Sequence, residues 1–284
     1  MNSAHTPESI LRRVGLALAV LVIVLVFLAP YEWLVASAFK PYADIFSGVF
    51  SLSVWTFVPR RPTLVNFIAV FRDQAFGRYV FNSLLVAGAQ VVGTVLVSTV
   101  AAFVLARVRF PGRNLVFGLV LVMLLIPFDA IVIPLFTTVR TLHLQDTYWG
   151  FFLPWIFSPF GIFFLKQVFE ELPTELDEAA IMDGASPLRV LTHVVVPNVL
   201  PGLATLALFT FLFAWDAFYW PLVVMSDDTK QLITVFIAKQ TTSQTQFWGN
   251  LFAASAVATI PVIALFVWLQ RYYVRGIMTT GLKD

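Results

Sequence analysis

Six segments of this chain are apolar over the length of a membrane-crossing helix, and they constrain its fold more than any other feature. A helix that crosses the hydrocarbon core of a bilayer needs about 20 mostly apolar residues. The segments that meet this length are roughly 14–38, 80–106, 115–138, 149–168, 199–224 and 251–273. The sequence therefore predicts an all-α membrane protein with six transmembrane helices between residues 14 and 273.

The composition excludes several other classes of protein. Hydrophobic residues make up 59% of the chain and charged residues only 12%, whereas a soluble domain has about 25% charged residues. A net charge of +2 without a basic cluster argues against nucleic-acid binding. Because the chain has no Cys, it forms no disulfide and no thiolate metal site.

The first apolar segment is expected to remain in the mature protein. Arg12-Arg13 precede it, and Ala36-Ser37-Ala38 resembles a signal-peptidase site, but the apolar run is longer than a signal region and five spans follow. An even number of spans places both termini on one side. The short loop 106–115 carries three Arg, which predicts a cytoplasmic N-terminus (1–13) and tail (274–284).

The expected outer segments differ in character. Residues 40–79 mix apolar and polar positions, which predicts an interfacial helix lying on the membrane. Residues 226–250 are polar and predict an exposed outer loop, either a contact for a soluble partner or an ordinary solvated loop. Within the second span, Thr94, Ser98 and Ala102 recur every four residues, which favours close helix packing inside this chain over an interface with another subunit.

The loop at 169–198 is acidic although apolar segments flank it. It contains six of the sixteen acidic residues of the chain, namely Glu170, Glu171, Glu175, Asp177, Glu178 and Asp183. Since each charge costs about 2.5–3.5 kcal/mol at a bilayer centre, the loop must lie in water or against a protein.

The pattern of this acidic loop predicts a short helix, a glycine corner and a second helix. Thr174 is the expected N-cap with Asp177 in the capping box, Gly184 ends the helix, and Ser186-Pro187 begins the next one. Such a helix could dock into a groove of a soluble protein. The alternative, an amphipathic connector on the bilayer, is less favoured because such connectors are usually basic.

Specific motifs give this chain a resemblance to a known family. The run Glu178-Ala-Ala-x-x-Asp183-Gly184-Ala-Ser186, followed by Pro197 and Pro201, resembles the EAA loop of ABC-importer permeases. Further similar motifs are Tyr79–Leu85, Arg109–Arg113, Ile126-Pro127, Trp215–Leu222 and Arg271–Gly276. From about residue 14 to its end, the chain is most similar to the smaller, second permease of maltose-type carbohydrate importers.

The resemblance implies a fold, a location and partners. The fold is that of a type I ABC-importer permease in a bacterial or archaeal cytoplasmic (inner) membrane, with a cytoplasmic coupling helix between spans four and five. The partners are a second homologous permease, two ATPase subunits and an extracytoplasmic binding protein. The resemblance assigns a role in coupling to the ATPase to seven residues, namely Leu176, Glu178, Ala179, Ala180, Asp183, Gly184 and Ser186. In such permeases the loop corresponding to 226–250 reaches the binding protein, and the tail touches the ATPases.

The chain also departs from the family pattern. The usual Trp-Asn-Asp-Phe of the fifth span is Trp215-Asp216-Ala217-Phe218, and the usual Leu-Pro after the coupling helix is Val196-Pro197. The first change puts in question whether a pore contact made by the family's Trp-Asn-Asp-Phe segment carries over to this chain.

No catalytic constellation is visible. The phosphate loop G-x-x-x-x-G-K-[ST] is absent, so ATP and Mg²⁺ are expected on partner ATPase subunits and no cofactor is expected in this chain. The three His (His5, His143 and His193) are scattered without metal-site spacing. The chain is therefore predicted to be a permease subunit and not an enzyme.

Two acidic residues within the spans are candidates for the substrate path. Asp216 is expected mid-span beside Trp215, Tyr219 and Trp220, where aromatic faces and a carboxylate suit a sugar. Alternatively, Asp216 bonds a neighbouring helix and the aromatics form an interfacial belt. Asp129 lies between two Pro and is expected to face a broken-helix cavity.

The predicted function is import of a sugar or polyol. Glycerol-3-phosphate or a glycerophosphodiester is the alternative, disfavoured because no Lys or Arg lies in the middle of a span. A self-sufficient secondary carrier is a weaker hypothesis, since no internal repeat is evident. The sequence does not identify the sugar.

Overall fold

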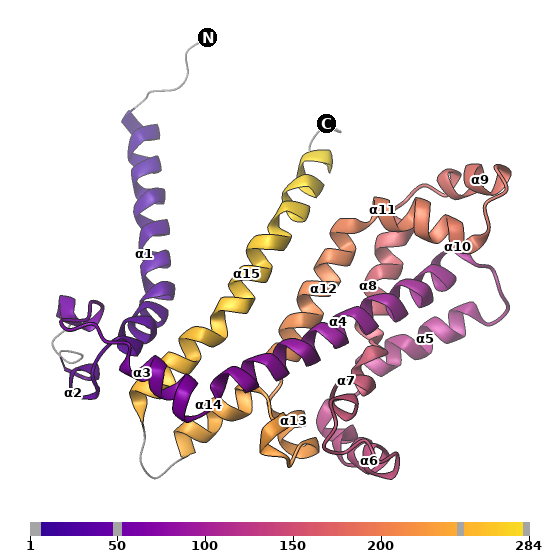
Figure 1. Cartoon of the computed structure of the whole chain (residues 1–284). Coiled ribbons are helices and arrows are strands. Elements are labelled where there is room, and N and C mark those ends of the chain that lie inside the picture. The colour runs from indigo at the N-terminus through magenta and orange to yellow at the C-terminus, as the bar shows by residue number, and fades with distance from the viewer. Residues whose placement is uncertain (1–6, 48–52, 243–246, 281–284) are drawn as a thin grey trace. The chain divides into compact units, whose positions relative to one another are not determined.

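The computed structural model describes residues 7–47, 53–242 and 247–280, which form helices and turns without a β-strand (Figure 1). Three helices are long and apolar enough to cross a membrane by themselves: Arg13–Ala38 within α1 (Pro7–Ala38), α4 (Phe76–Arg107) and Trp248–Gln270 within α15 (Trp248–Thr280). Three bent helix pairs raise the possible number of spans to six. These helices confirm the expectation of an all-helical membrane protein, with three to six possible spans in the described residues.

Two of the predicted spans, 115–138 and 149–168, are each divided into two helices by a bend, and a broken helix was expected only near Asp129. The first pair, α5 (Arg113–Leu124) with α6 (Phe128–Thr141), bends by 102°, and the second, α7 (Tyr148–Ile156) with α8 (Pro159–Glu170), bends by 40°. Pro127 precedes α6 and Pro159 opens α8. Because proline donates no amide hydrogen bond, both residues suit the start of a new helix and not its interior.

The third bent pair joins a group of short helices to a long one. The group comprises α10 (Pro187–Val190), the π-helix η3 (Leu191–Val195) and α11 (Val196–Asn198). It meets α12 (Leu200–Trp215) at 82°. The predicted fifth span, 199–224, therefore contains α12 and a separate short helix, α13 (Tyr219–Val224).

Both expected outer segments are structured differently from the prediction. Residues 40–79 do not form one interfacial helix; they hold α2 (Tyr42–Ile45), η1 (Val54–Thr56), α3 (Val65–Ile68), the π-helix η2 (Ala69–Asp73) and the start of α4. Residues 226–250 are not simply an exposed loop. They include η4 (Asp228–Lys230), α14 (Ile233–Thr242) and the start of α15, and Leu232 and Ile233 are buried. Residues 243–246 lie outside the described residues.

The chain divides into two compact units, and the first comprises residues 1–76 and 237–259. In its described part, Asn66 Nδ2 donates to the carbonyls of Ala38 and Lys40 at 2.8 and 2.9 Å. The buried Lys40 Nζ donates to the Thr56 carbonyl at 2.7 Å. Burial lowers the pKa of Lys40, and the nearby Asp44 carboxylate partly opposes this shift. These bonds fix the end of α1 to the segment that follows it.

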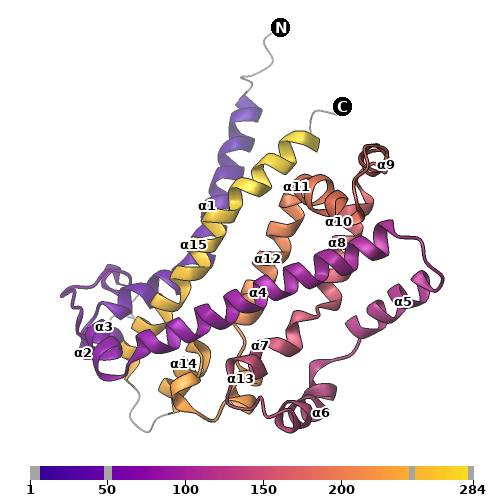
Figure 2. The ribbon, with the colours of Figure 1, turned by 45° about the vertical axis from the view of Figure 1, so that its right-hand side comes forward.

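The second unit, residues 77–236 and 260–284, has its main hydrophobic clusters along α4. One cluster joins Val86 of α4 to Phe151 of α7 and Trp220 of α13. The other joins Ala102 of α4 to Leu165 of α8 and Leu206 of α12. The two views in Figure 1 and Figure 2 show α4 crossing α12 and α8.

The small residues of α4 pack inside this chain. Thr94, Ser98 and Ala102 are all fully buried, and a Cβ placed on Gly161 of α8 would lie 2.5 Å from the Ser98 hydroxyl oxygen. The backbones of α4 and α8 therefore approach closely here, which agrees with the intrachain packing favoured by the sequence.

Gly150→Ala is expected to destabilise the protein because a Cβ at Gly150 would clash with the backbone carbonyl oxygen of Leu144. The cost of such overpacking is about 1–3 kcal/mol. Gly118→Ala is the matched control, since nothing lies within 4 Å of its Cβ position in helix α5. Thermal unfolding in detergent, followed by fluorescence, should show a lower midpoint for Gly150→Ala alone. Equal midpoints for the two variants would contradict the close approach.

Candidate functional site

The acidic segment forms two helices joined at a glycine corner. Helix α9 (Glu175–Met182) is followed by Gly184 with φ +82°, and Ser186 is extended before Pro187 opens α10. Positive φ is strained for any residue but glycine. Figure 1 and Figure 2 show α9 beyond the end of α8, at one end of the second unit.

Helix α9 begins directly after Thr174, as predicted, but the expected capping hydrogen bond is absent. Thr174 has helical backbone angles, φ −70° and ψ −21°, and its side chain makes no capping hydrogen bond. Ser186 also makes no capping hydrogen bond, although its extended backbone starts α10 as expected.

Most residues assigned to coupling by resemblance are exposed. The exposed members are Leu176, Glu178, Ala179, Asp183, Gly184 and Ser186, whereas Ala180 is half-buried and packs against the cluster around Phe169. Large apolar side chains share this surface, since Met182 is 87% and Leu188 68% exposed. An exposed surface that combines apolar and acidic side chains is suited to contact another protein.

Asp177 is the one buried acid of this helix. Its Oδ2 lies 2.9 Å from Nε of Arg107, the last residue of α4. Arg107 is one of the three Arg counted in the loop 106–115, and its pairing with Asp177 was not predicted from the sequence. The sequence held one signal for this partner. Small residues in the same helix indicate that part of it packs against the protein, and a carboxylate that becomes buried there needs a cation nearby.

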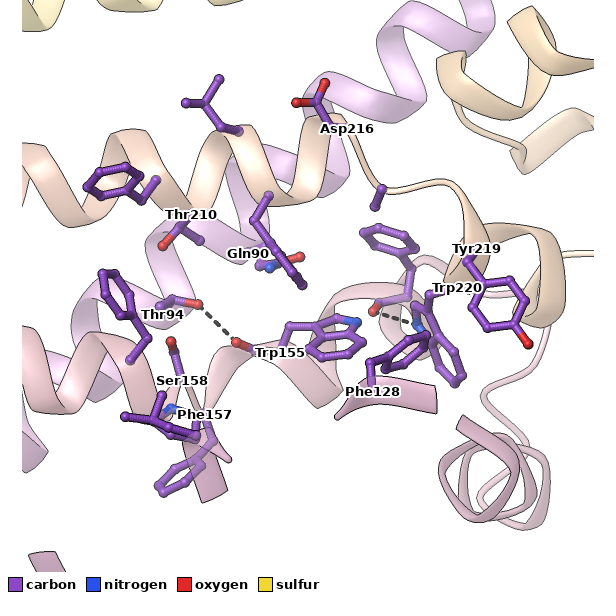
Figure 3. Close-up of a pocket in the computed structure, with 18 of the residues that line it drawn as sticks. Gln90, Thr94, Phe128, Trp155, Phe157, Ser158, Thr210, Asp216, Tyr219 and Trp220 are labelled. Atoms are coloured by element: carbon purple, nitrogen blue, oxygen red, sulfur yellow. Dashed lines mark hydrogen bonds between the residues drawn. The ribbon is translucent and has the colours of Figure 1, made fainter. Parts of the chain in front are cut away.

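A second site is a cavity of about 860 Å³ within the second unit. Figure 3 shows Phe128, Trp155, Tyr219 and Trp220 gathered towards one end, and Thr94, Ser158 and Thr210 towards the other. The remaining polar members of the lining are Gln90 and Asp216, and the lining includes no Lys or Arg. The walls are therefore mainly aromatic, with few hydrogen-bonding groups and a single acid.

Hydrogen bonds and ring contacts hold these walls in place. Trp220 Nε1 donates to the Phe151 carbonyl at 3.1 Å, and Thr94 Oγ1 donates to the Trp155 carbonyl at 3.1 Å. The rings of Trp155 and Trp220 meet edge to face with centroids 6.3 Å apart. Locked rings of this kind provide a preformed apolar surface for a ligand.

The structure brings together only part of the predicted substrate-path set. Asp216, Tyr219 and Trp220 line the cavity, whereas Trp215 and Asp129 do not. Trp215 is buried against Phe211, with ring centroids 5.5 Å apart, and Asp129 is exposed in the first turn of α6. Asp129 therefore does not line this cavity, and its expected position beside a broken-helix cavity stays a prediction.

Asp216 also differs from its predicted position within a helix. It follows the last residue of α12 as the C-cap, and the chain crosses two residues before α13 begins at Tyr219. The Asp216 carboxylate lies just past the end of α12. It therefore borders the cavity at a break between two helices and not from the middle of a continuous helix.

Comparison with known proteins identifies the family. Residues 98–279 match the family described as "binding-protein-dependent transport system inner membrane component". The chain belongs to this family. It is thus a multi-pass inner-membrane permease, in agreement with its long apolar helices.

Characterised relatives align over most of this permease. The arabinooligosaccharides transport system permease protein of Halalkalibacterium halodurans is 32% identical, over 88% of this chain and 89% of the relative. The trehalose transport system permease protein of Mycobacterium tuberculosis is 33% identical, over 90% and 92%. The sn-glycerol-3-phosphate transport system permease protein of Yersinia enterocolitica is 34% identical, over 72% and 73%.

A solved structure supports the fold. One chain of a bacterial ABC transporter involved in import of the acidic polysaccharide alginate superposes with a TM-score of 0.83. The match covers 96% of this permease and 100% of that chain at 22% identity. The fold of this permease is therefore that of the matched transporter chain.

Proposed function

We propose that this permease is the non-catalytic membrane subunit of an ATP-driven ABC importer and carries a neutral sugar or polyol. It pairs with a second permease and two ATPase subunits, which bind ATP and Mg²⁺, and it receives substrate from an extracytoplasmic binding protein. The observation that carries the proposal is the exposed α9–α10 corner in a chain whose full-length relatives are transport permeases.

The α9–α10 corner is the proposed ATPase docking site. Glu178, Ala179 and Gly184 contact the ATPase, with Leu176, Ala180, Asp183 and Ser186 shaping the same surface. Their exposure and the neighbouring apolar side chains support this role. In this arrangement both termini and residues 169–198 are cytoplasmic, and residues 226–250 face the binding protein.

The aromatic cavity is the proposed part of the substrate path. Sugar rings stack on aromatic faces, and their hydroxyls donate to carboxylate oxygens. Tyr219 is 48% exposed and Asp216 is also exposed, so both groups are accessible to a substrate. The open side of the cavity is suited to completion by the second permease.

Glycerol-3-phosphate remains the second candidate because one relative carries that name. The charges of the cavity favour the neutral substrate. Its only charged side chain is Asp216, which would repel a phosphate, and its lining provides no cation. A phosphate substrate would therefore depend on cations from the second permease.

Affinity purification of this permease from its native membranes tests the assembly. We expect an ATPase and a second permease to co-purify, and uptake into reconstituted vesicles to require ATP. Uptake by this chain alone, driven by an ion gradient without ATP, would overturn the proposal in favour of a secondary carrier.

A further inference from the structure

The guanidinium of Arg107 joins three helices at the end of the second unit that carries α9. Its Nη2 donates to the carbonyls of Phe169 and Leu172 at 2.8 Å each, and its Nε lies 2.9 Å from Asp177 Oδ2. The side chains of Arg107 and Asp177 are only 10% and 13% exposed. A planar group with several fixed donors suits such a three-way contact.

Neither carbonyl receives the helical hydrogen bond from the amide four residues further along the chain. Four residues after Phe169 stands Pro173, which has no amide hydrogen to continue the helical ladder. Four residues after Leu172 stands Leu176, whose amide donates to the Pro173 carbonyl instead. The Phe169 carbonyl accepts from the Leu172 amide at 3.2 Å, so Arg107 adds a second donor there and supplies a donor to the Leu172 carbonyl.

Asp177 gives α9 its polar connection to the membrane helices. Glu175 and Glu178 in the same turn are exposed, and Ala180 adds an apolar contact with the core. Within the described residues, Arg107–Asp177 is the only ion pair between this helix and α4 or α8. A buried pair resists separation, since removing one partner leaves the other charge uncompensated.

The same two membrane helices carry walls of the cavity. Gln90 and Thr94 belong to α4, and Pro159 and Phe160 open α8 at its other end. A displacement of α9 that pulls on Arg107 would move α4 and α8 as rigid bodies, and the cavity walls would move with them.

We infer that Arg107 and Asp177 are positioning residues that transmit movement of α9 to the cavity-lining helices α4 and α8. This inference rests on the proposed function, because it requires an ATPase to move α9. It assigns Asp177 a role distinct from its exposed neighbours, which face the ATPase: the Asp177 carboxylate faces the permease itself.

The absence of Cys from the chain provides a direct readout without a known substrate. Phe157→Cys places a thiol on the cavity wall, at a position 46% exposed, between α7 and α8. The assembled complex in proteoliposomes is treated with a water-soluble maleimide with and without ATP, and labelling of this chain is followed by its mass. In the otherwise natural complex, ATP should change the labelling rate about fivefold or more.

Asp177→Asn removes the charge while keeping the side-chain size. We expect the ATPase to remain bound and to hydrolyse ATP, while the effect of ATP on labelling falls to less than about twofold. Asp177→Glu should restore the response, because it restores the ion pair. The matched control is Glu170→Gln: Glu170 pairs with Lys166 at 2.7 Å at the same end of α8, and its ion pairs are with Lys166 and Arg113, not with α9.

The outcomes separate this inference from the proposed function. No response to ATP in the Phe157→Cys complex without further change would count against ATP-driven coupling itself. A full response in Asp177→Asn, or an equal loss in Glu170→Gln, would overturn the role of the pair alone. Loss of the ATPase with Asp177→Asn would make Asp177 a docking residue and also overturn it. If Asp177→Asn fails to fold, Arg107→Lys is tested in its place, since the ammonium of lysine does not present the fixed planar fork of donors that the guanidinium provides.

Discussion

Replacing Gly184 with proline should abolish recovery of the ATPase with this permease. Gly184 has φ +82°, and its amide donates to the Ile181 carbonyl at 2.9 Å. Proline is fixed near φ −65° and has no amide hydrogen, so the corner between α9 and α10 cannot form. Loss of a central contact of about 2 kcal/mol or more lowers binding about thirtyfold. Co-purification from detergent-solubilised membranes measures the effect.

The matched control is Gly112→Pro. Gly112 has φ +84° and precedes α5 in the loop between α4 and α5, so proline is equally incompatible there. It lies outside the proposed docking corner, and the ATPase should still be recovered. Equal loss from both variants would show that the effect arises from general misfolding and not from the α9–α10 corner.

A charge reversal tests the same surface without changing the backbone. Glu178→Lys alters an exposed side chain of α9, and we expect it to reduce ATPase recovery strongly. Glu171→Lys is the control, because Glu171 is also exposed but lies at the end of α8, outside the proposed docking set. Unimpaired docking and uptake with Glu178→Lys would contradict the coupling role of this residue.

The features that were predictable from sequence depend on local physical rules. The apolar segments were evident because bilayer thickness sets their length. The corner at Gly184 was evident because few residues adopt its backbone conformation. Both rules act within about twenty residues, so they need no knowledge of tertiary contacts.

The helix breaks were not predictable from proline alone. Pro127 and Pro159 begin new helices, whereas Pro134 and Pro154 lie inside α6 and α7. Whether a proline ends a helix depends on how neighbouring segments satisfy the carbonyl that it leaves free. Those neighbours are distant in sequence.

The two candidate acids illustrate the same limit. Asp129 and Asp216 both looked like cavity residues because each lies in an apolar segment near aromatic residues or prolines. Only Asp216 lines the cavity, since the bends at Leu125–Pro127 and after Trp215 decide which way each segment runs. The direction in which the chain continues after a helix break depends on tertiary contacts.

Asp216→Ala should raise the KM for uptake of a neutral sugar by about 10–100-fold, while leaving assembly with the ATPase intact. A hydrogen bond to a charged group contributes about 1.5–3 kcal/mol, which corresponds to that range. Uptake by the reconstituted complex at increasing sugar concentration measures the change. Asp129→Ala is the matched control, because this carboxylate is exposed and does not line the cavity.

The sign of the Asp216→Ala effect also distinguishes the two candidate substrates. If the complex carries glycerol-3-phosphate, the Asp216 carboxylate repels the substrate, and its removal should lower the KM. If it carries a neutral sugar, the carboxylate accepts hydrogen bonds from hydroxyl groups, and its removal should raise the KM. An unchanged KM for both substrates, or an equal change in Asp129→Ala, would exclude Asp216 from the substrate path and leave the aromatic walls as the contribution of this cavity.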